Sequence, residues 1–273
     1  MDQKVDKHFS GKEYNAKEYW TERAKEAKDD LHAVCTRDVK GIRNQIMDRV
    51  QSRILSNFIK NESFAGKEIL ELGCGVGRWV PFFRQFGLKY SGVDISKEML
   101  EIVKEKYPDI DFSEYNPGDR LKYDDNHFDY IVSITVLHHN PQEDQKKIIK
   151  ELSRILKPGG KIFIMESCRS EYFTTFSNTE EEWEAMFAES GMRMNKKRLY
   201  RYFSVQGMLR SIKKIFKPEK VDRTKAGGIG GGAKDNEYSA ARSYVLKLGL
   251  LDPYLMDFLP KRFYKGIIAE FEK

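Results

Sequence analysis

The feature that most restricts the fold of this chain is a short apolar segment that runs into three closely spaced glycines, Glu68-Ile-Leu-Glu-Leu-Gly-Cys-Gly-Val-Gly-Arg78. Ile69, Leu70 and Leu72 give the apolar character of a parallel strand that is buried on both faces. Glycines permit positive φ angles and let the backbone approach a ligand closely. The segment therefore predicts a buried strand followed by a tight turn against a nucleotide-like ligand.

The spacing of the glycines separates this turn from dinucleotide sites. Gly73, Gly75 and Gly77 alternate with single residues, whereas a pyrophosphate-binding turn has the pattern Gly-x-Gly-x-x-Gly. Glu71 stands just before the glycines, where a carboxylate would repel a diphosphate but attract a cationic or amine-bearing group. We therefore expect a positively charged cofactor.

Further strand signals follow along the chain. Asp94 lies at the end of an apolar segment about twenty residues on, a spacing at which an acid can accept hydrogen bonds from both ribose hydroxyls. A helical spacing of apolar residues predicts a helix that Lys157-Pro-Gly-Gly ends. The expected strands cover 90–95, 110–115, 128–137 and 162–165, and the expected helix covers 145–156.

The chain resembles the class I S-adenosylmethionine-dependent methyltransferases in four features that occur in order: Glu71-x-Gly-x-Gly-x-Gly, Asp94, the Phe128-Asp129 strand and Leu156-Lys-Pro-Gly-Gly. The resemblance covers about residues 45–170. It implies a Rossmann-like, doubly wound α/β fold with seven strands in the order 3-2-1-4-5-7-6, strand seven being antiparallel. It also implies S-adenosyl-L-methionine as the cofactor and methyl transfer as the reaction.

The resemblance assigns cofactor-binding roles by position. It places the three glycines and Glu71 along the methionine and ribose, and Asp94 at the ribose hydroxyls. The other candidates are two apolar neighbours of the adenine, an acid and its neighbour in the loop after the third strand, and a residue at the end of the fourth strand: Ile95, Met99, Asp119, Arg120 and Thr135. Glu114 is the alternative acid in that loop.

Candidate catalytic residues follow the fourth and fifth expected strands. His138 and His139 stand after the fourth strand, and an imidazole has a pKa suited to accepting a proton near neutral pH. We expect His138 to be the base and His139 to be structural, although either histidine could instead only pack the loop. Glu166 follows the fifth strand and is expected to orient a histidine or bind a polar acceptor. We predict no metal, because methyl transfer from a sulfonium needs none.

Two regions lie outside this core. Residues 1–45 are expected to form a helical lid, with Tyr14, Tyr19, Trp20 and Arg23 as candidate contacts, and residues 46–273 to form the methyltransferase domain. A helix is also expected from the apolar spacing between Ile42 and Phe58. Expected strands at 193–202 and 262–271 enclose a helical insertion at about 204–260.

The positive charge of the chain is local. The net charge is +6, but residues 192–225 hold twelve Lys or Arg against two Asp or Glu, so this segment carries +10 and the rest about −4. A basic amphipathic helix at 205–217 is suited to peripheral membrane contact or nucleic acid, or it caps the core. An RNA (tRNA or rRNA) methyltransferase that uses 192–225 is therefore the alternative function.

The leading hypothesis is methyl transfer to an oxygen or nitrogen of a small-molecule, sugar (glycan) or lipid-linked acceptor. A third hypothesis is a non-enzymatic, cofactor-binding subunit that activates a partner protein. The chain has no apolar run of membrane-spanning length, a charged N-terminal segment and three scattered cysteines, which together favour a cytoplasmic protein.

Overall fold

The computed structural model describes residues 14–27, 29–37, 41–168, 174–200 and 266–273. Seven helices and one 3-10 turn occur in these ranges: α1 Ala16–Glu26, α2 Asp30–Val34, α3 Ile42–Ile59, α4 Val80–Arg84, α5 Lys97–Lys106, η1 Leu137–His139, α6 Gln142–Ile155 and α7 Glu180–Glu189. Seven strands accompany them: β1 Glu68–Leu72, β2 Lys89–Asp94, β3 Asp111–Glu114, β4 Phe128–Ile134, β5 Leu156–Ser167, β6 Arg193–Tyr200 and β7 Gly266–Glu272.

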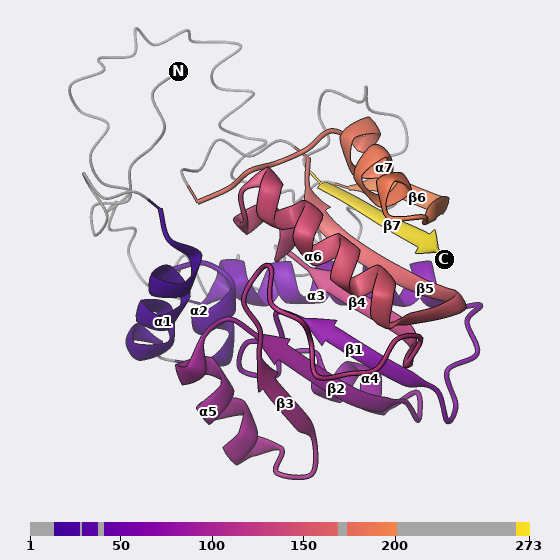
Figure 1. Cartoon of the computed structure of the whole chain (residues 1–273). Coiled ribbons are helices and arrows are strands. Elements are labelled where there is room, and N and C mark those ends of the chain that lie inside the picture. The colour runs from indigo at the N-terminus through magenta and orange to yellow at the C-terminus, as the bar shows by residue number, and fades with distance from the viewer. Residues whose placement is uncertain (1–13, 28, 38–40, 169–173, 201–265) are drawn as a thin grey trace, which may run out of the picture.

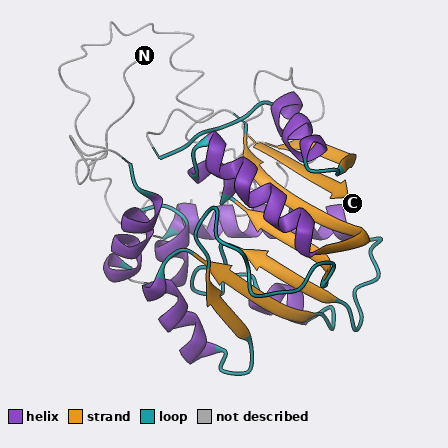
Figure 2. Ribbon diagram, in the orientation of Figure 1, coloured by secondary structure: helices purple, strands orange, loops and turns teal. Residues whose placement is uncertain are grey.

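The strands form one sheet with helices on both faces (Figures 1 and 2). Their order is β3-β2-β1-β4-β5-β7-β6, and β7 runs antiparallel to both of its neighbours. The predicted fold class, strand order and orientation of strand seven are therefore confirmed. The carboxyl ends of β1, β2 and β3 point toward α1, α2 and α5 (Figure 1).

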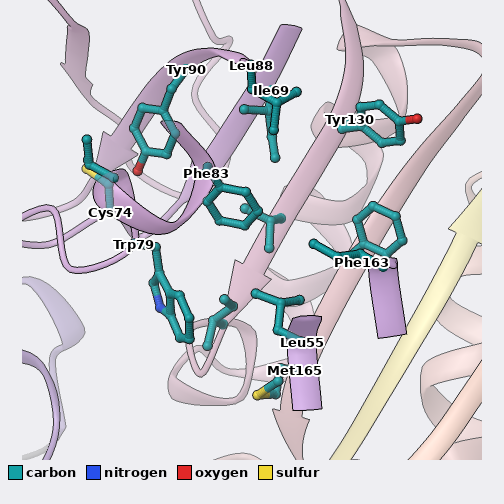
Figure 3. Close-up of a cluster of buried hydrophobic side chains, with 14 of the residues drawn as sticks. Leu55, Ile69, Cys74, Trp79, Phe83, Leu88, Tyr90, Tyr130, Phe163 and Met165 are labelled. Atoms are coloured by element: carbon teal, nitrogen blue, oxygen red, sulfur yellow. The ribbon is translucent and has the colours of Figure 1, made fainter. Parts of the chain in front are cut away.

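Alternate residues of the strands divide the core into two apolar layers. Ile69 of β1 and Phe163 of β5 face the layer that contains α3 and α4, part of which is drawn in Figure 3. Leu70 and Ile162, their neighbours in sequence, face the opposite layer under α6 and α7. This alternation follows from the two-residue repeat of a strand and explains why apolar residues fill both positions.

Local sequence sets the starts of several helices. The Ser96 hydroxyl accepts a hydrogen bond from the Met99 amide and begins α5, while Thr179 and Glu182 form a capping box at the start of α7. The expected helix after residue 42 is present as α3. Among the helices of the described ranges, none combines the length and apolar character that a membrane crossing needs.

The structure corrects the end of the fourth strand. We expected it to reach residue 137, but β4 ends at Ile134. Thr135 has a φ of 59°, in the left-handed region, which breaks the extended backbone, and η1 follows. The expected insertion at about 204–260, its helix at 205–217, and the first part of both the lid and the last strand lie outside the described residues.

Candidate active site

A cavity of about 840 Å³, its open mouth included, lies at the carboxyl ends of β1, β2 and β4. Its walls come from α1, α2, the glycine turn, α5, the loop after β3 and the turn after β4. The lining residues are Ala16, Trp20, Val34, Glu71, Leu72, Gly73, Cys74, Gly75, Arg78, Trp79, Asp94, Ile95, Met99, Tyr115, Pro117, Ile134, Thr135, Val136, His139, Asn140 and Ile148.

The glycine turn fits against three neighbours that leave no room for side chains. A Cβ on Gly73 would lie 2.3 Å from a methyl carbon of Val136, and one on Gly75 would lie 2.7 Å from Val34. A Cβ on Gly77 would lie 2.7 Å from Val103 in α5. Gly77 is not among the lining residues. It therefore lets the turn pack on α5, while Gly73 and Gly75 form the cavity floor.

Asp94 holds a fixed carboxylate at the end of β2. Its Oδ2 accepts a hydrogen bond from the Gly75 amide at 2.8 Å, and its Oδ1 accepts one from the Ser96 amide at 2.9 Å. Burial raises the pKa of Asp94, and these backbone donors oppose the rise. Ile95 and Met99 line the cavity beside it. The predicted ribose acid thus lies at the cavity wall in one defined orientation.

Glu71 is almost fully buried and faces the same cavity. The Tyr90 hydroxyl donates a hydrogen bond to its Oε2. Burial raises the pKa of Glu71 to about 8, and Tyr90 and Arg78 only partly offset this effect. A cationic group in the cavity would favour the charged carboxylate and would therefore displace the proton.

Thr135 connects β4 to η1 in a strained conformation. Its φ of 59° is costly for a β-branched residue, about 1–3 kcal/mol, and such outliers cluster at functional sites. The Thr135 amide donates to the Met165 carbonyl at 2.8 Å. Thr135 and Val136 both line the cavity, so the strained turn forms part of its wall.

The structure places the two histidines in different surroundings. His138 is 5% exposed, and its Nδ1 lies 2.5 Å from Oε2 of the fully buried Glu166. Neither residue is among those that line the cavity. His138 faces the protein interior because η1 rotates it toward β5. Glu166 therefore binds a histidine side chain within the core. Orienting a histidine was one of its two expected roles.

His139 is the histidine that lines the cavity. Its Nδ1 is 2.7 Å from the Thr174 carbonyl oxygen, which can only accept, so Nδ1 carries the hydrogen. Burial, together with the neighbouring His138, lowers the pKa of His139 to about 3. The neutral ring then has its lone pair on Nε2. The Trp20 ring of α1 packs edge-on against it, with 5.2 Å between the ring centroids.

Asp119 and Arg120 are exposed and are not among the lining residues. The Asp119 amide donates to the Asn116 carbonyl at 3.0 Å, which closes a tight turn and directs this part of the loop outward. Arg120 pairs with Asp125 at 3.0 Å. Tyr115 and Pro117, from the same loop, line the cavity instead. Contact with the adenine remains a prediction for Asp119 and Arg120, and this geometry does not favour it.

Helix α1 crosses the cavity and is anchored at several points. Lys17 donates to Glu114 at 2.5 Å, and Thr21 donates to Glu98 at 2.8 Å. Of the expected lid contacts, Trp20 lines the cavity, whereas Arg23 is buried and donates to the His32 carbonyl. The carboxylate of Glu114, the alternative acid for the adenine, is therefore engaged by α1.

Comparison with known proteins gives consistent results. Residues 70–164 match a family model described as a methyltransferase domain. A demethylmenaquinone methyltransferase from Staphylococcus saprophyticus is 30% identical over 166 residues, which cover 52% of this chain and 70% of that protein. This chain is a class I S-adenosylmethionine-dependent methyltransferase.

Solved structures share the fold of this methyltransferase. The cyclase SpnF is 18% identical with a TM-score of 0.54, covering 84% of this chain and 82% of that chain. Phosphoethanolamine N-methyltransferase 2 from Haemonchus contortus, solved in complex with S-adenosyl-L-methionine, is 20% identical with a TM-score of 0.51 and covers 84% of this chain and 52% of that one. The cofactor of the family is S-adenosylmethionine. Because one neighbour is named a cyclase, the fold alone does not define a reaction.

Several residues of the methyltransferase cavity were not expected from the sequence. Arg78 and Trp79 follow the glycines directly, and the Arg78 guanidinium donates to Asp48 and Gln51 of α3 at 2.8 and 2.6 Å. Ala16, Val34 and Asn140 also line the cavity. No sequence pattern marks these three, since they reach the site only through the packing of α1, α2 and η1. Within the described ranges, no group of three His, Cys, Asp or Glu side chains is arranged to hold a metal.

Proposed function

We propose that this methyltransferase moves the methyl group of S-adenosylmethionine to an oxygen or nitrogen of a small molecule enclosed beneath α1. The observation that carries the proposal is the packing of Trp20 on His139, which brings α1 against the wall of the cavity at the end of β4. A site covered in this way fits a compact acceptor or the end of a sugar or lipid-linked one. A folded RNA surface would need a more open approach.

The cofactor would lie across the glycine turn. Gly73 and Gly75 give the backbone its close approach, Asp94 offers oxygens to ribose hydroxyls, and Glu71 offers a carboxylate to the cationic methionine end. Ile95 and Met99 would flank the adenine. These roles are supported by the arrangement of the side chains around one cavity.

Methyl transfer from a sulfonium is an in-line displacement, in which the acceptor atom bonds to the methyl carbon as the carbon–sulfur bond breaks. Much of the rate comes from positioning the acceptor. His139 is neutral at physiological pH, so its Nε2 would accept a hydrogen bond from the acceptor's N–H or O–H. A pKa of about 3 makes His139 a weak base, because efficient general bases titrate near the working pH. Orientation of the acceptor is therefore the role we assign to His139.

The relative from Staphylococcus saprophyticus is named for demethylmenaquinone. Demethylmenaquinone is a small molecule that is methylated on a ring carbon, so this relative supports a small-molecule acceptor but does not support the choice of oxygen or nitrogen. We also propose that the protein is cytoplasmic. It would divide into a helical lid, residues 1–45, and a methyltransferase domain, residues 46–273.

The alternative acceptor is RNA, bound by the basic segment 192–225. Only residues 192–200 of it are described. In that part Lys196 donates to the Phe58 carbonyl, and Lys197 pairs with Glu180 at 3.2 Å. These two lysines are engaged within the protein, so the described part of the segment does not favour the RNA hypothesis.

The test is a labelled-methyl transfer screen. The full chain is incubated with methyl-labelled S-adenosylmethionine and cell extract fractions that contain RNA, protein, lipid or small molecules. We expect label in the small-molecule or lipid fraction, and none with Asp94→Ala, which should lose cofactor binding in calorimetry. Label in RNA, with an initial rate that falls steeply with salt, would instead support the alternative.

A further inference from the structure

Glu166, near the end of β5, is a fully buried carboxylate whose two oxygens hold one short segment of the chain. Its polar contacts all go to the segment 133–138. Oε1 accepts from the Ser133 hydroxyl at 2.9 Å and from the amides of Val136 and Leu137 at 3.2 Å each; Oε2 accepts from the His138 amide at 3.3 Å and lies 2.5 Å from His138 Nδ1. One side chain therefore satisfies three consecutive amides.

These contacts satisfy backbone amides that would otherwise be buried without a hydrogen-bond partner. The turn begins with Thr135 in the left-handed region, and the amides after it point into the core, where an unpaired donor is costly. Ion pairs with Lys or Arg do not occur at Glu166 within the described ranges. The Ser133 hydroxyl, three backbone amides and the His138 ring are therefore the polar groups that surround this buried carboxyl group.

The same turn divides its residues between core and cavity. Leu137 and His138 are buried beside Glu166, whereas Thr135, Val136 and His139 line the cavity. Two more bonds fix the far side of the turn, from Asn140 Nδ2 to the Val136 carbonyl at 2.9 Å and from the Phe176 amide to the His138 carbonyl at 2.6 Å. The orientation of His139 thus depends on how the residues before it are held.

We propose that Glu166 is a positioning residue, which clamps the turn after β4 so that His139 faces the acceptor. It does not touch the acceptor itself, since its side chain is 0% exposed and both of its oxygens are occupied. The functional part of this proposal rests on the proposed role of His139, whereas the clamp itself stands on the hydrogen bonds alone.

Glu166→Gln is the matched test, because it keeps the shape of the side chain and replaces one oxygen by an NH₂ group. That group cannot accept from the His138 amide, so one contact becomes a pair of opposed donors. In the full chain labelled with ¹⁵N-histidine, we expect the imidazole signals of His139, assigned with His139→Gln, to shift or broaden. We also expect the maximal rate of labelled-methyl transfer to the active fraction to fall at least about tenfold. The KM for S-adenosylmethionine should stay within about threefold.

Glu270→Gln is the control, since Glu270 is a buried carboxylate of β7 that pairs with Lys161 at 3.4 Å, among residues that do not line the cavity. It should lower thermal stability without changing the His139 signals. If Glu166→Gln does not fold, Ser133→Ala, which removes one contact to Oε1, replaces it and should give the same changes to a smaller degree. Unchanged His139 signals, or changed signals with an unchanged transfer rate, would overturn the proposal. The spectroscopic result needs no acceptor, so it stays informative if the proposed acceptor class is wrong.

Discussion

Single residues in this cavity are constrained by the space around them. Gly73 and Gly66 both have φ near +70°, but a Cβ on Gly73 would meet Val136, whereas one on Gly66 would meet nothing within 4 Å. The two positions thus separate the cost of a left-handed backbone from the cost of a steric clash. Gly73 lies against Val136 in the strained turn after β4, so a side chain at position 73 would displace that turn.

Gly73→Ala is expected to destabilise the protein more than Gly66→Ala. The left-handed conformation costs an alanine about 1–2 kcal/mol at either position, and the clash at Gly73 adds about 1–3 kcal/mol. Urea denaturation of both variants measures the difference, and calorimetry with S-adenosylmethionine should show binding lost in Gly73→Ala only. Equal destabilisation of the two variants would mean that Val136 moves aside freely.

The buried Glu71 predicts a proton release when the cofactor binds. Its pKa of about 8 means that the carboxyl is mostly protonated at pH 7 before the cofactor binds, and a cationic ligand would favour the carboxylate. Calorimetry at pH 7 in buffers of different ionisation enthalpy should show proton release, approaching one per cofactor, and affinity should rise with pH up to about 8. Glu71→Gln should bind without this release; an equal release from that variant would point to Asp94.

The raised pKa of Glu71 also makes the stability of the folded protein depend on pH. The pKa of Glu71 is raised from 4.5, so between pH 4.5 and 8 the folded protein without cofactor binds more protons at this carboxyl than the unfolded chain does. The contribution of Glu71 to stability is therefore complete below pH 4.5 and is lost as the pH rises through 8.

Among the elements, α1 joins the two halves of the site. Its Lys17 and Thr21 bind Glu114 and Glu98, near the ends of β3 and β2, while Trp20 packs on His139 after β4. The helix is short and amphipathic only in part, so these contacts, and not its own propensity, hold it in place. A ligand in the cavity should therefore stabilise α1.

Loss of one anchor should loosen α1 measurably. Thr21→Val removes the hydrogen bond to Glu98, which is worth about 1 kcal/mol, so the α1 amides should exchange with deuterium roughly fivefold faster. Saturating S-adenosylmethionine should slow that exchange. Glu105→Gln, at an exposed position of α5, is the control and should exchange as the wild type does. Unchanged exchange in Thr21→Val would show that Trp20 and Lys17 suffice.

For the whole molecule, the last strand is inserted into the sheet and is not added at its edge. β7 lies between β5 and β6, and within the described ranges β6 pairs with β7 alone. Phe271 of β7 stacks on Phe187 of α7 with 3.7 Å between the ring centroids, and both rings are fully buried. The final residues therefore complete both the sheet and the layer beneath α7.

Truncation of this contact should be costly to the entire fold. Phe271→Ala leaves a large cavity and should lower the free energy of unfolding by about 3–5 kcal/mol. The melting temperature should fall by about 6–20 °C. Phe86→Ala, at a half-buried ring near the start of β2, should have a smaller effect. Calorimetric melts of both variants, with and without cofactor, measure this difference. A larger loss of stability in Phe86→Ala than in Phe271→Ala would contradict the prediction.

Apolar runs and glycines in the sequence predicted the strands and turns that depend on residues close together in the chain. The strand and glycine turn at 68–78, the acid at Asp94 and the strand order implied by the resemblance are all present in the fold. Apolar runs and glycines act within a few residues, so they can be interpreted without knowing the neighbours. The end of β4 was misplaced because Thr135 takes a left-handed conformation that its sequence does not favour.

The sequence by itself determined the strand and glycine turn at 68–78, and it placed Glu71 and Asp94 as the acids beside that turn. Only the tertiary structure decided that His139 faces the cavity while His138 turns inward to Glu166, and that Trp20 packs on His139 at the cavity wall. The physical reason is distance along the chain. His138 and Glu166 are 28 residues apart, and their hydrogen bond forms only because β4 and β5 pair in one register.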